Sequence, residues 1–264
     1  MYRVALSIAG SDPSGGAGIQ ADLKTFHQFG VYGEAVLTLI TVQNTECVRR
    51  VERLPSELVA AQLSAVVEDI PPHAAKTGAL GSADVVEAVA EASAQFDFPL
   101  VVDPVLISKH GRPLAAEDAI PTMRERLIPR AALVTPNLSE AAVLTGIPVN
   151  GFEDMHQAAL RIRDMGARAV LIKGGHLLGD PVDLLFDGAD WHEFSAARIE
   201  TPHTHGTGCT LSAAITACLA RGEPLVTAVA KAKCYITEAI RLHPSLGRGS
   251  GPVYHHAPAP EKSI

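Results

Sequence analysis

A glycine-rich turn carries a cysteine into the start of an expected helix. Gly206 and Gly208 precede Cys209, and the amphipathic stretch 211–219 follows. Glycines let the backbone turn tightly, and the first N–H groups of a helix have no intrahelical partner. The helix dipole adds positive charge there, so the turn could hold a phosphate and should favour the thiolate form of Cys209. Three interpretations stay open: a plain helix start, an anion-binding turn of a kinase, and a cysteine nucleophile paired with His205.

A second glycine-rich segment, residues 10–18, joins an apolar stretch to a helical pattern that contains Asp22. It matches neither the Walker-type pattern GxxxxGK[ST] nor GxGxxG, so it predicts neither a P-loop nor a nicotinamide site. The segment could be only a turn. Alternatively, Asp22 could hydrogen-bond a small polar ligand beneath it.

Four further polar residues stand near the ends of expected strands. Asn137 and Glu140 are three apart, which suits a helix cap and equally suits a magnesium ion held through water beside phosphates. Lys173 precedes two glycines and is either a phosphate-binding cation or a surface lysine. Asp103 follows an apolar stretch and is either a turn former or a second magnesium contact.

Short apolar stretches alternate with helical patterns along almost the whole chain. Strands are expected at 4–9, 36–42, 74–77, 100–102, 132–135 and 169–173, with a hairpin of 182–186 and 191–194. Helices are expected at 19–26, from 56 to 70, at 82–89, 120–127, 155–165, 210–220 and 225–242. This alternation predicts an α/β fold in which helices cover both faces of a mostly parallel sheet.

The polar clusters follow five of these strands. Gly10, Gln43, Asp103, Asn137 and Lys173 each come where a strand should end. Ligands of such sheets bind at the carboxyl ends of the strands, so we expect one site at this edge. Because no linker or change of composition divides the chain, we expect a single domain over 1–264, with a Gly/Pro-rich tail at 244–264.

The composition limits the partners. A net charge of −7 counts against nucleic acid or an anionic membrane as the main partner. No stretch approaches the roughly 20 apolar residues of a membrane span. The four cysteines form no CxxC pair, so neither a zinc site nor a disulfide framework is indicated, and a reducing cytoplasm is the expected location.

Seven motifs follow one another in the order and approximate spacing of one family. They are AGSDPSGGAGIQADLK at 9–24, QNT at 43–45, KTGAL at 76–80, VDPV at 102–105, TPNLSEA at 135–141, KGGH at 173–176 and THGTGC at 204–209. Over about residues 3–256 the chain resembles the hydroxymethylpyrimidine/phosphomethylpyrimidine kinases of thiamine biosynthesis. The resemblance implies a ribokinase-like three-layer α/β/α sandwich with a mostly parallel central sheet.

The resemblance also implies roles for individual residues. It implies that ATP and Mg²⁺ are used, that the substrate is an aminopyrimidine, and that the enzyme is a homodimer. The implied pyrimidine-binding positions are Gly10, Asp22, Gln43 and Val105, and the implied anion hole is Gly206, Thr207 and Gly208, with Cys209 as the base. The implied ATP-binding positions are Asn137, Lys173, His176, Thr207 and Lys233. The implied magnesium shell is Asp103 and Glu140.

Three positions depart from the family pattern. Ala79 stands where many members have Met, and His203 replaces a common Asn. Ser108 stands in the loop where a subgroup that also accepts pyridoxal has a second cysteine, which favours a pyrimidine kinase. The alternatives are a pyridoxal kinase on the same scaffold, a cysteine hydrolase that uses Cys209 and His205, and a non-catalytic pyrimidine or nucleotide sensor.

Overall fold

The computed structural model describes residues 2–109, 111–175, 177 and 179–260. The strands are β1 (Val4–Ser11), β2 (Tyr32–Gln43), β3 (Val48–Arg53), β4 (Ala74–Thr77), β5 (Leu100–Val102), β6 (Leu133–Val134), β7 (Val170–Ile172), β8 (Val182–Phe186) and β9 (Trp191–Ser195). The α-helices are α1 (Gly18–Gln28), α2 (Ser56–Asp69), α3 (Ala83–Ser93), α4 (Ala119–Thr122), α5 (Leu138–Thr145), α6 (Phe152–Asp164), α7 (Thr207–Ala220) and α8 (Leu225–Arg241).

The strands form one nine-stranded sheet in the order β3-β2-β1-β4-β5-β6-β7-β8-β9. From β2 to β7 in this order all neighbours pair parallel, while β3, β8 and β9 are antiparallel to their neighbours. Helices connect most of the parallel strands, as their crossovers require. The predicted mostly parallel sheet and the hairpin of β8 and β9 are both confirmed.

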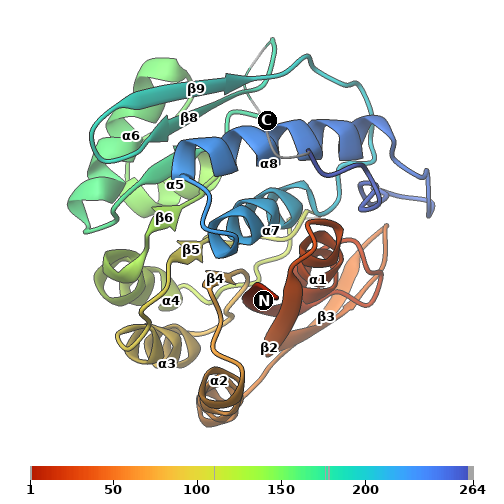
Figure 1. Cartoon of the computed structure of the whole chain (residues 1–264). Helices are drawn as coiled ribbons and strands as arrows, with labels where there is room; N and C mark the ends of the chain where they lie inside the picture. The colour runs from red at the N-terminus through yellow and green to blue at the C-terminus, as the bar shows by residue number, and fades with distance from the viewer. Residues whose placement is uncertain (1, 110, 176, 178, 261–264) are drawn as a thin grey trace.

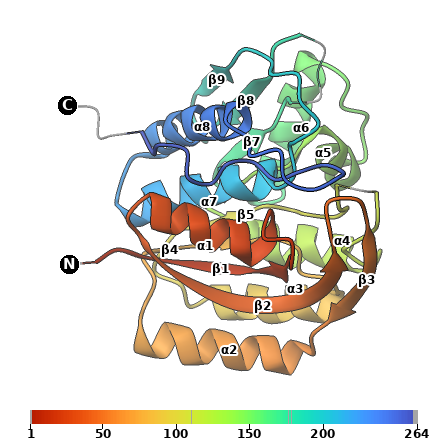
Figure 2. The ribbon, with the colours of Figure 1, turned by 90° about the vertical axis from the view of Figure 1, so that its right-hand side faces the viewer.

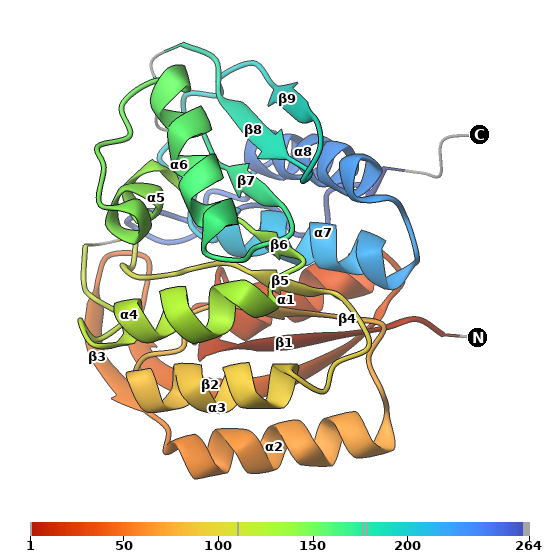
Figure 3. The ribbon, with the colours of Figure 1, turned by 90° about the vertical axis from the view of Figure 1, so that its left-hand side faces the viewer.

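Helices cover both faces of this sheet (Figure 1). Val101 belongs to the buried cluster that includes side chains of α1, α7 and α8, whereas its neighbour Val102 belongs to the cluster that includes side chains of α2 to α6. Successive side chains of a strand point to opposite faces, so a strand buried on both sides is apolar throughout. Figures 2 and 3 show the two helix layers from opposite sides. The predicted three-layer α/β/α sandwich is confirmed.

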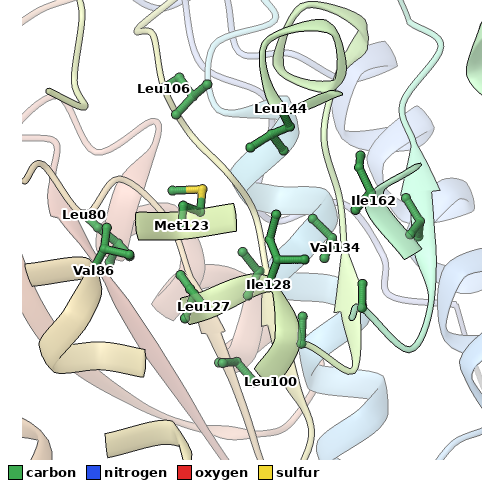
Figure 4. Packing of buried hydrophobic residues seen from close by; sticks show 14 of the residues in the cluster. Leu80, Val86, Leu100, Leu106, Met123, Leu127, Ile128, Val134, Leu144 and Ile162 are labelled. Carbon is green, nitrogen blue, oxygen red and sulfur yellow. The ribbon is translucent and has the colours of Figure 1, made fainter. Parts of the chain in front are cut away.

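One of the two cores is built around the segment that follows α4. Figure 4 shows Met123, Leu127 and Ile128 in one cluster with Leu100 of β5 and Val134 of β6. All five side chains are buried. Close packing of this kind holds the strands rigidly in place, and the strands in turn position the loops at their carboxyl ends.

Two local predictions differ from the structure. The segment 120–127 was expected to be one helix, but it is the short α4, a π-helical turn (η1, Met123–Leu127) and a 3₁₀ turn (η2, Ile128–Arg130). Pro121 and Pro129 lie in this stretch, and proline has no N–H to donate to a helix. The edge strand β3 was not expected, since its apolar Val48 and Val51 are three residues apart and do not alternate with polar ones.

The tail after α8 packs back onto the molecule. Figure 2 shows it running past α7 and α1 towards the β2–β3 hairpin. Val253 and Ala257 are buried in the core of α1, α7 and α8. Within the described residues, no helix combines the length and apolar character needed to cross a bilayer.

Candidate active site

A cavity of about 690 Å³ opens at the carboxyl ends of the parallel strands. It brings together almost all of the residues singled out in the sequence. Its lining includes Gly10, Gln43, Asp103, Val105, Asn137, Glu140, Lys173, Gly206, Thr207, Gly208, Cys209 and Lys233. His176 lies outside the described residues. The residues expected at this edge of the sheet thus line one cavity.

The turn before α7 has the backbone that its glycines predict. Gly206 is in the left-handed region with φ = 82°, and a Cβ there would lie 1.7 Å from the carbonyl oxygen of Gly16. The loop after β1 thus packs directly on the turn, which only glycine allows. A Cβ on Gly208 would be 3.3 Å from Nζ of Lys173. The helix N-terminus and a lysine side chain therefore face the same space, which is an arrangement suited to an anion.

The Cys209 thiol differs from the sequence-based prediction. Burial raises its pKa to about 11, and the charge of Lys76 and a backbone hydrogen bond from Gly18 oppose this only in part. Burial disfavours the charged thiolate, and the nearby carboxylates of Asp22 and Asp103 raise the pKa further. The expectation of a more accessible thiolate is wrong for this structure.

Lys173 is ion-paired inside the site and is not a surface lysine. Its Nζ lies 2.9 Å from Oδ1 of Asp103 and 4.0 Å from Oε2 of Glu140. Thr135 and Ser212 donate to the Asp103 carboxylate from 3.2 Å each. Burial alone would raise the pKa of Asp103, but the charges of Lys173 and Lys76 hold it below its ordinary value. The site thus contains an ionised carboxylate beside a cation.

Glu140 caps a helix. The Glu140 N–H donates to Oδ1 of Asn137 (2.9 Å), and the Asn137 N–H donates to Oε2 of Glu140 (2.8 Å). This reciprocal pair is a capping box at the start of α5. Burial, opposed by the charge of Lys173 and assisted by that of Asp103, raises the pKa of Glu140 to about 7. Capping, one of the two interpretations of this pair, is confirmed.

The carboxylates of Asp103 and Glu140 fit Mg²⁺ only as ligands that act through water. Among the described residues, no three His, Cys, Asp or Glu side chains gather as a metal site. Mg²⁺ usually keeps several waters and takes one or two carboxylates together with substrate phosphates. Asp103 and Glu140 line the cavity and suit that role, with water between the ion and the protein.

Asp22 does not line the cavity, contrary to the expected contact with a ligand. It is fully buried, and its Oδ2 lies 2.8 Å from Nζ of Lys76 and 2.6 Å from Oγ of Ser7. A buried lysine needs a counter-charge, and Asp22 supplies it. Lys76 was not predicted as a site residue; a lysine within the otherwise uncharged β4 sequence AAKT was the available signal.

Asp12 and His205 form a second pair that the sequence did not single out. Nε2 of His205 lies 2.7 Å from Oδ2 of Asp12 and 3.1 Å from Nε2 of Gln43. The imidazole is thus directed at Asp12 and Gln43, which argues against a hydrolase dyad with Cys209. The signal that could have found this pair is the placement of Asp12 at a strand end beside a glycine loop.

Lys233 joins the site from α8. Its Nζ lies 2.8 Å from Oδ2 of Asp183 and donates to the carbonyl of Pro181 at 3.1 Å. The cavity wall beside it includes the apolar Ile236 and Ile240 of the same helix. This end of the cavity therefore combines an apolar helix face with a cation.

Comparison with known proteins gives consistent results. The family model for phosphomethylpyrimidine kinase matches residues 12–254. The hydroxymethylpyrimidine/phosphomethylpyrimidine kinase of Streptomyces coelicolor is 51% identical over 250 residues, which cover 95% of this chain and 93% of that protein. The thiamine biosynthesis bifunctional protein ThiED of Geobacter sulfurreducens is 52% identical over 252 residues; they cover 95% of this chain and 51% of the relative, so the chain spans about half of that protein.

Solved structures agree on the fold. A pyridoxal kinase from Bacillus subtilis, solved as an ADP complex, has a TM-score of 0.89 and 39% identity, and the match covers 97% of this chain and 98% of that one. A phosphomethylpyrimidine kinase from Clostridium difficile has a TM-score of 0.80 and 44% identity, and the match covers 90% and 99%. With the family model matched over most of its length, the chain belongs to the phosphomethylpyrimidine kinase family.

Proposed function

We propose that the protein transfers the γ-phosphoryl group of ATP to the hydroxymethyl oxygen of 4-amino-5-hydroxymethyl-2-methylpyrimidine, and then phosphorylates the monophosphate to the diphosphate. One observation carries the proposal: the glycine turn before α7, Cys209 and Lys173 all line one cavity. Phosphoryl transfer needs positioned donors and cations more than covalent chemistry from the protein. The S. coelicolor relative carries this activity in its name.

Each part of the site has a task in this transfer. The N–H groups at the start of α7 and Nζ of Lys173 would stabilise charge on the equatorial oxygens of the transferred group. Mg²⁺ would add positive charge beside the phosphates, held through water by Asp103 and Glu140. The Cys209 sulfur would accept the hydroxyl proton as its thiolate, which is the minor form of a thiol whose pKa is about 11. Gly10, Gln43 and Val105 would hold the pyrimidine ring, and Asn137 and Lys233 would contact ATP.

A pyridoxal kinase is the second candidate, because pyridoxal kinases are among the structures that match over almost the whole chain. The loop after β5 nevertheless carries Ser108 at the position where the pyridoxal-accepting subgroup has cysteine. The test is ADP release with ATP and either the aminopyrimidine or pyridoxal. We expect a higher kcat/KM for the aminopyrimidine; faster turnover of pyridoxal would overturn the choice, and no substrate-dependent ADP release would remove kinase activity altogether.

Three further expectations belong to this proposal. We infer that residues 1–264 act as one kinase unit, since segments from Ala9 to Ile240 line one cavity beside a single sheet. The enzyme should be a cytoplasmic homodimer, as the family resemblance implies. Light scattering of the purified chain tests the dimer, and a monomeric mass at assay concentration would contradict it.

A further inference from the structure

The side chains of Asp12, His205 and Gln43 meet at one wall of the cavity. They come from the loop after β1, the turn before α7 and the end of β2, and all three line the cavity. Nε2 of His205 lies 2.7 Å from Oδ2 of Asp12 and 3.1 Å from Nε2 of Gln43. One imidazole nitrogen therefore contacts both a carboxylate and a primary amide.

Asp12 determines which atom of this triad carries the proton. Its carboxylate accepts hydrogen bonds from the N–H groups of Ser14 (2.9 Å), Gly16 (3.2 Å) and Ala17 (2.9 Å). Burial alone would raise the pKa of Asp12, but hydrogen bonds from His205 and Ser14 hold it below its ordinary value. An ionised carboxylate only accepts, so Nε2 of His205 must donate to it.

A nitrogen that donates cannot also accept from Gln43. If Nε2 of His205 is protonated and the amide nitrogen of Gln43 lies 3.1 Å away, two N–H donors face each other and repel. A half-turn of the amide removes this repulsion, because its oxygen then shares the imidazole proton. Within the described part of the chain, no other hydrogen bond holds the Gln43 amide.

We infer that Asp12 and His205 act as positioning residues that turn the Gln43 amide so that its NH₂ group faces the cavity and selects a substrate with a ring-nitrogen acceptor. The inference rests on the proposed function, because an aminopyrimidine presents two such ring nitrogens with in-plane lone pairs. Gln43 is the recognising group, and the two residues behind it set its direction. An amide with its oxygen in the cavity would instead select a donor, such as the exocyclic amino group.

Gln43→Glu tests this direction. The carboxylate keeps an oxygen towards His205 but puts an acceptor where the NH₂ group was, so it faces the lone pair of the ring nitrogen. At pH 8 we expect the KM for the aminopyrimidine to rise about 10- to 100-fold, as expected when a polar group is left without its partner. The KM for ATP should stay the same. An unchanged or lower KM for the pyrimidine would overturn the inference.

Two substitutions of His205 separate positioning from a structural role. His205→Gln keeps an N–H group that can reach both Asp12 and the Gln43 oxygen, so the KM for the pyrimidine should stay within about threefold of wild type. His205→Met removes the donor and should raise that KM about tenfold or more, with a smaller change in kcat. Thermal melts of both variants report on folding.

The outcomes also distinguish this inference from the proposed function. If the wild-type enzyme releases no ADP with the aminopyrimidine, the proposed function fails. If the wild-type enzyme is active and Gln43→Glu or His205→Met has the wild-type KM for the pyrimidine, only the positioning inference fails.

Discussion

Cys209 is where sequence and structure disagree most. A helix N-terminus should lower the pKa of a thiol, yet burial raises that of Cys209 to about 11. If the sulfur accepts the hydroxyl proton, Cys209→Ala should reduce the rate of transfer by about 10²–10⁴ and leave the Kd for ATP unchanged. ADP release and nucleotide titration measure the two effects. The exposed Cys234→Ala is the matched control; near-normal turnover of Cys209→Ala would remove the base role.

The raised pKa predicts how Cys209 reacts with iodoacetamide. Only the thiolate reacts, and a shift from 9.0 to about 11 lowers its fraction on the order of 100-fold below pH 9. The alkylation rate should therefore rise about tenfold for each pH unit between pH 7 and 10. Mass spectrometry of the Cys209 peptide follows the reaction, with exposed Cys234 as an internal reagent control. A plateau that begins below pH 8 would restore the prediction of an accessible thiolate.

Gly206 is required for its left-handed backbone and for its close contact with Gly16. Comparison with Gly222 distinguishes the two reasons. Gly206 and Gly222 both have left-handed φ, at 82° and 79°. A Cβ on Gly206 would strike the Gly16 carbonyl at 1.7 Å, whereas a Cβ on Gly222 would meet nothing within 4 Å. Gly222→Ala should therefore cost only the conformational strain, about 1–2 kcal/mol.

Gly206→Ala adds a backbone clash to the same strain. The loop after β1 must move away from the turn before α7, so we expect a larger loss of unfolding free energy and a loss of transfer activity. Urea unfolding and ADP release of the two variants give the comparison. Equal stability and equal activity in both would show that the contact with Gly16 does not matter.

At the scale of elements, Lys173 joins the ends of β5 and β7 across β6. It follows β7 and pairs with Asp103, which follows β5. Lys173→Met would leave the buried Asp103 carboxylate without its cation, which typically costs about 3–5 kcal/mol. Urea unfolding measures this. Adding Asp103→Asn should recover part of the stability, because the carboxylate that Lys173 contacts most closely is then neutral, but should not recover activity.

An exposed ion pair provides the control for Lys173. Arg126 and Glu87 pair on the surface at 2.6 Å, where solvent screens the charges. Arg126→Met should therefore change the unfolding free energy very little. A Lys173→Met variant that is as stable as Arg126→Met would contradict a structural contribution from the buried pair.

The elements also show what the sequence can predict. Strands such as β5 and β7 were recognisable because they are buried on both faces and therefore uniformly apolar. The convergence of Asp103, Asn137 and Lys173 followed from parallel strands alone. The edge strand β3 was not recognisable, because its identity comes from pairing with β2 and not from a pattern of its own.

The finer features of the site depend on contacts between distant residues. No spacing in the sequence indicates that Asp22 neutralises Lys76, or that Asp12 contacts His205 across the fold. The predicted direction of the Cys209 pKa shift was wrong for the same reason. That direction depends on burial, and burial depends on parts of the chain that are distant in sequence. The backbone conformation of the turn before α7 was predictable, because glycine readily adopts the left-handed φ that Gly206 has.

At the scale of the whole molecule, the C-terminal tail packs against the turn before α7. His205 N donates to the Gly251 carbonyl at 3.0 Å, and Val253 N donates to the His205 carbonyl at 3.2 Å. Arg248 pairs with Glu46 of the β2–β3 hairpin at 3.0 Å. The tail therefore ties the turn before α7 to the hairpin that carries Gln43.

Two apolar residues of the tail test this role. Val253 is 1% exposed and Leu246 is 59% exposed. Val253→Ala should lower the unfolding free energy by about 1–2 kcal/mol, because it removes buried methyl groups and leaves a cavity, whereas Leu246→Ala should have little effect.

Amide hydrogen exchange shows whether the stability lost in Val253→Ala is also lost locally at the active site. Because Val253 pairs with the backbone of His205, its truncation should speed amide exchange in a peptide covering 203–209 more than in one covering β5. The KM for the pyrimidine should rise with it, since the same turn holds His205 beside Gln43. Exchange that rises equally in both peptides would mean that the tail adds only global stability and that the site does not depend on it.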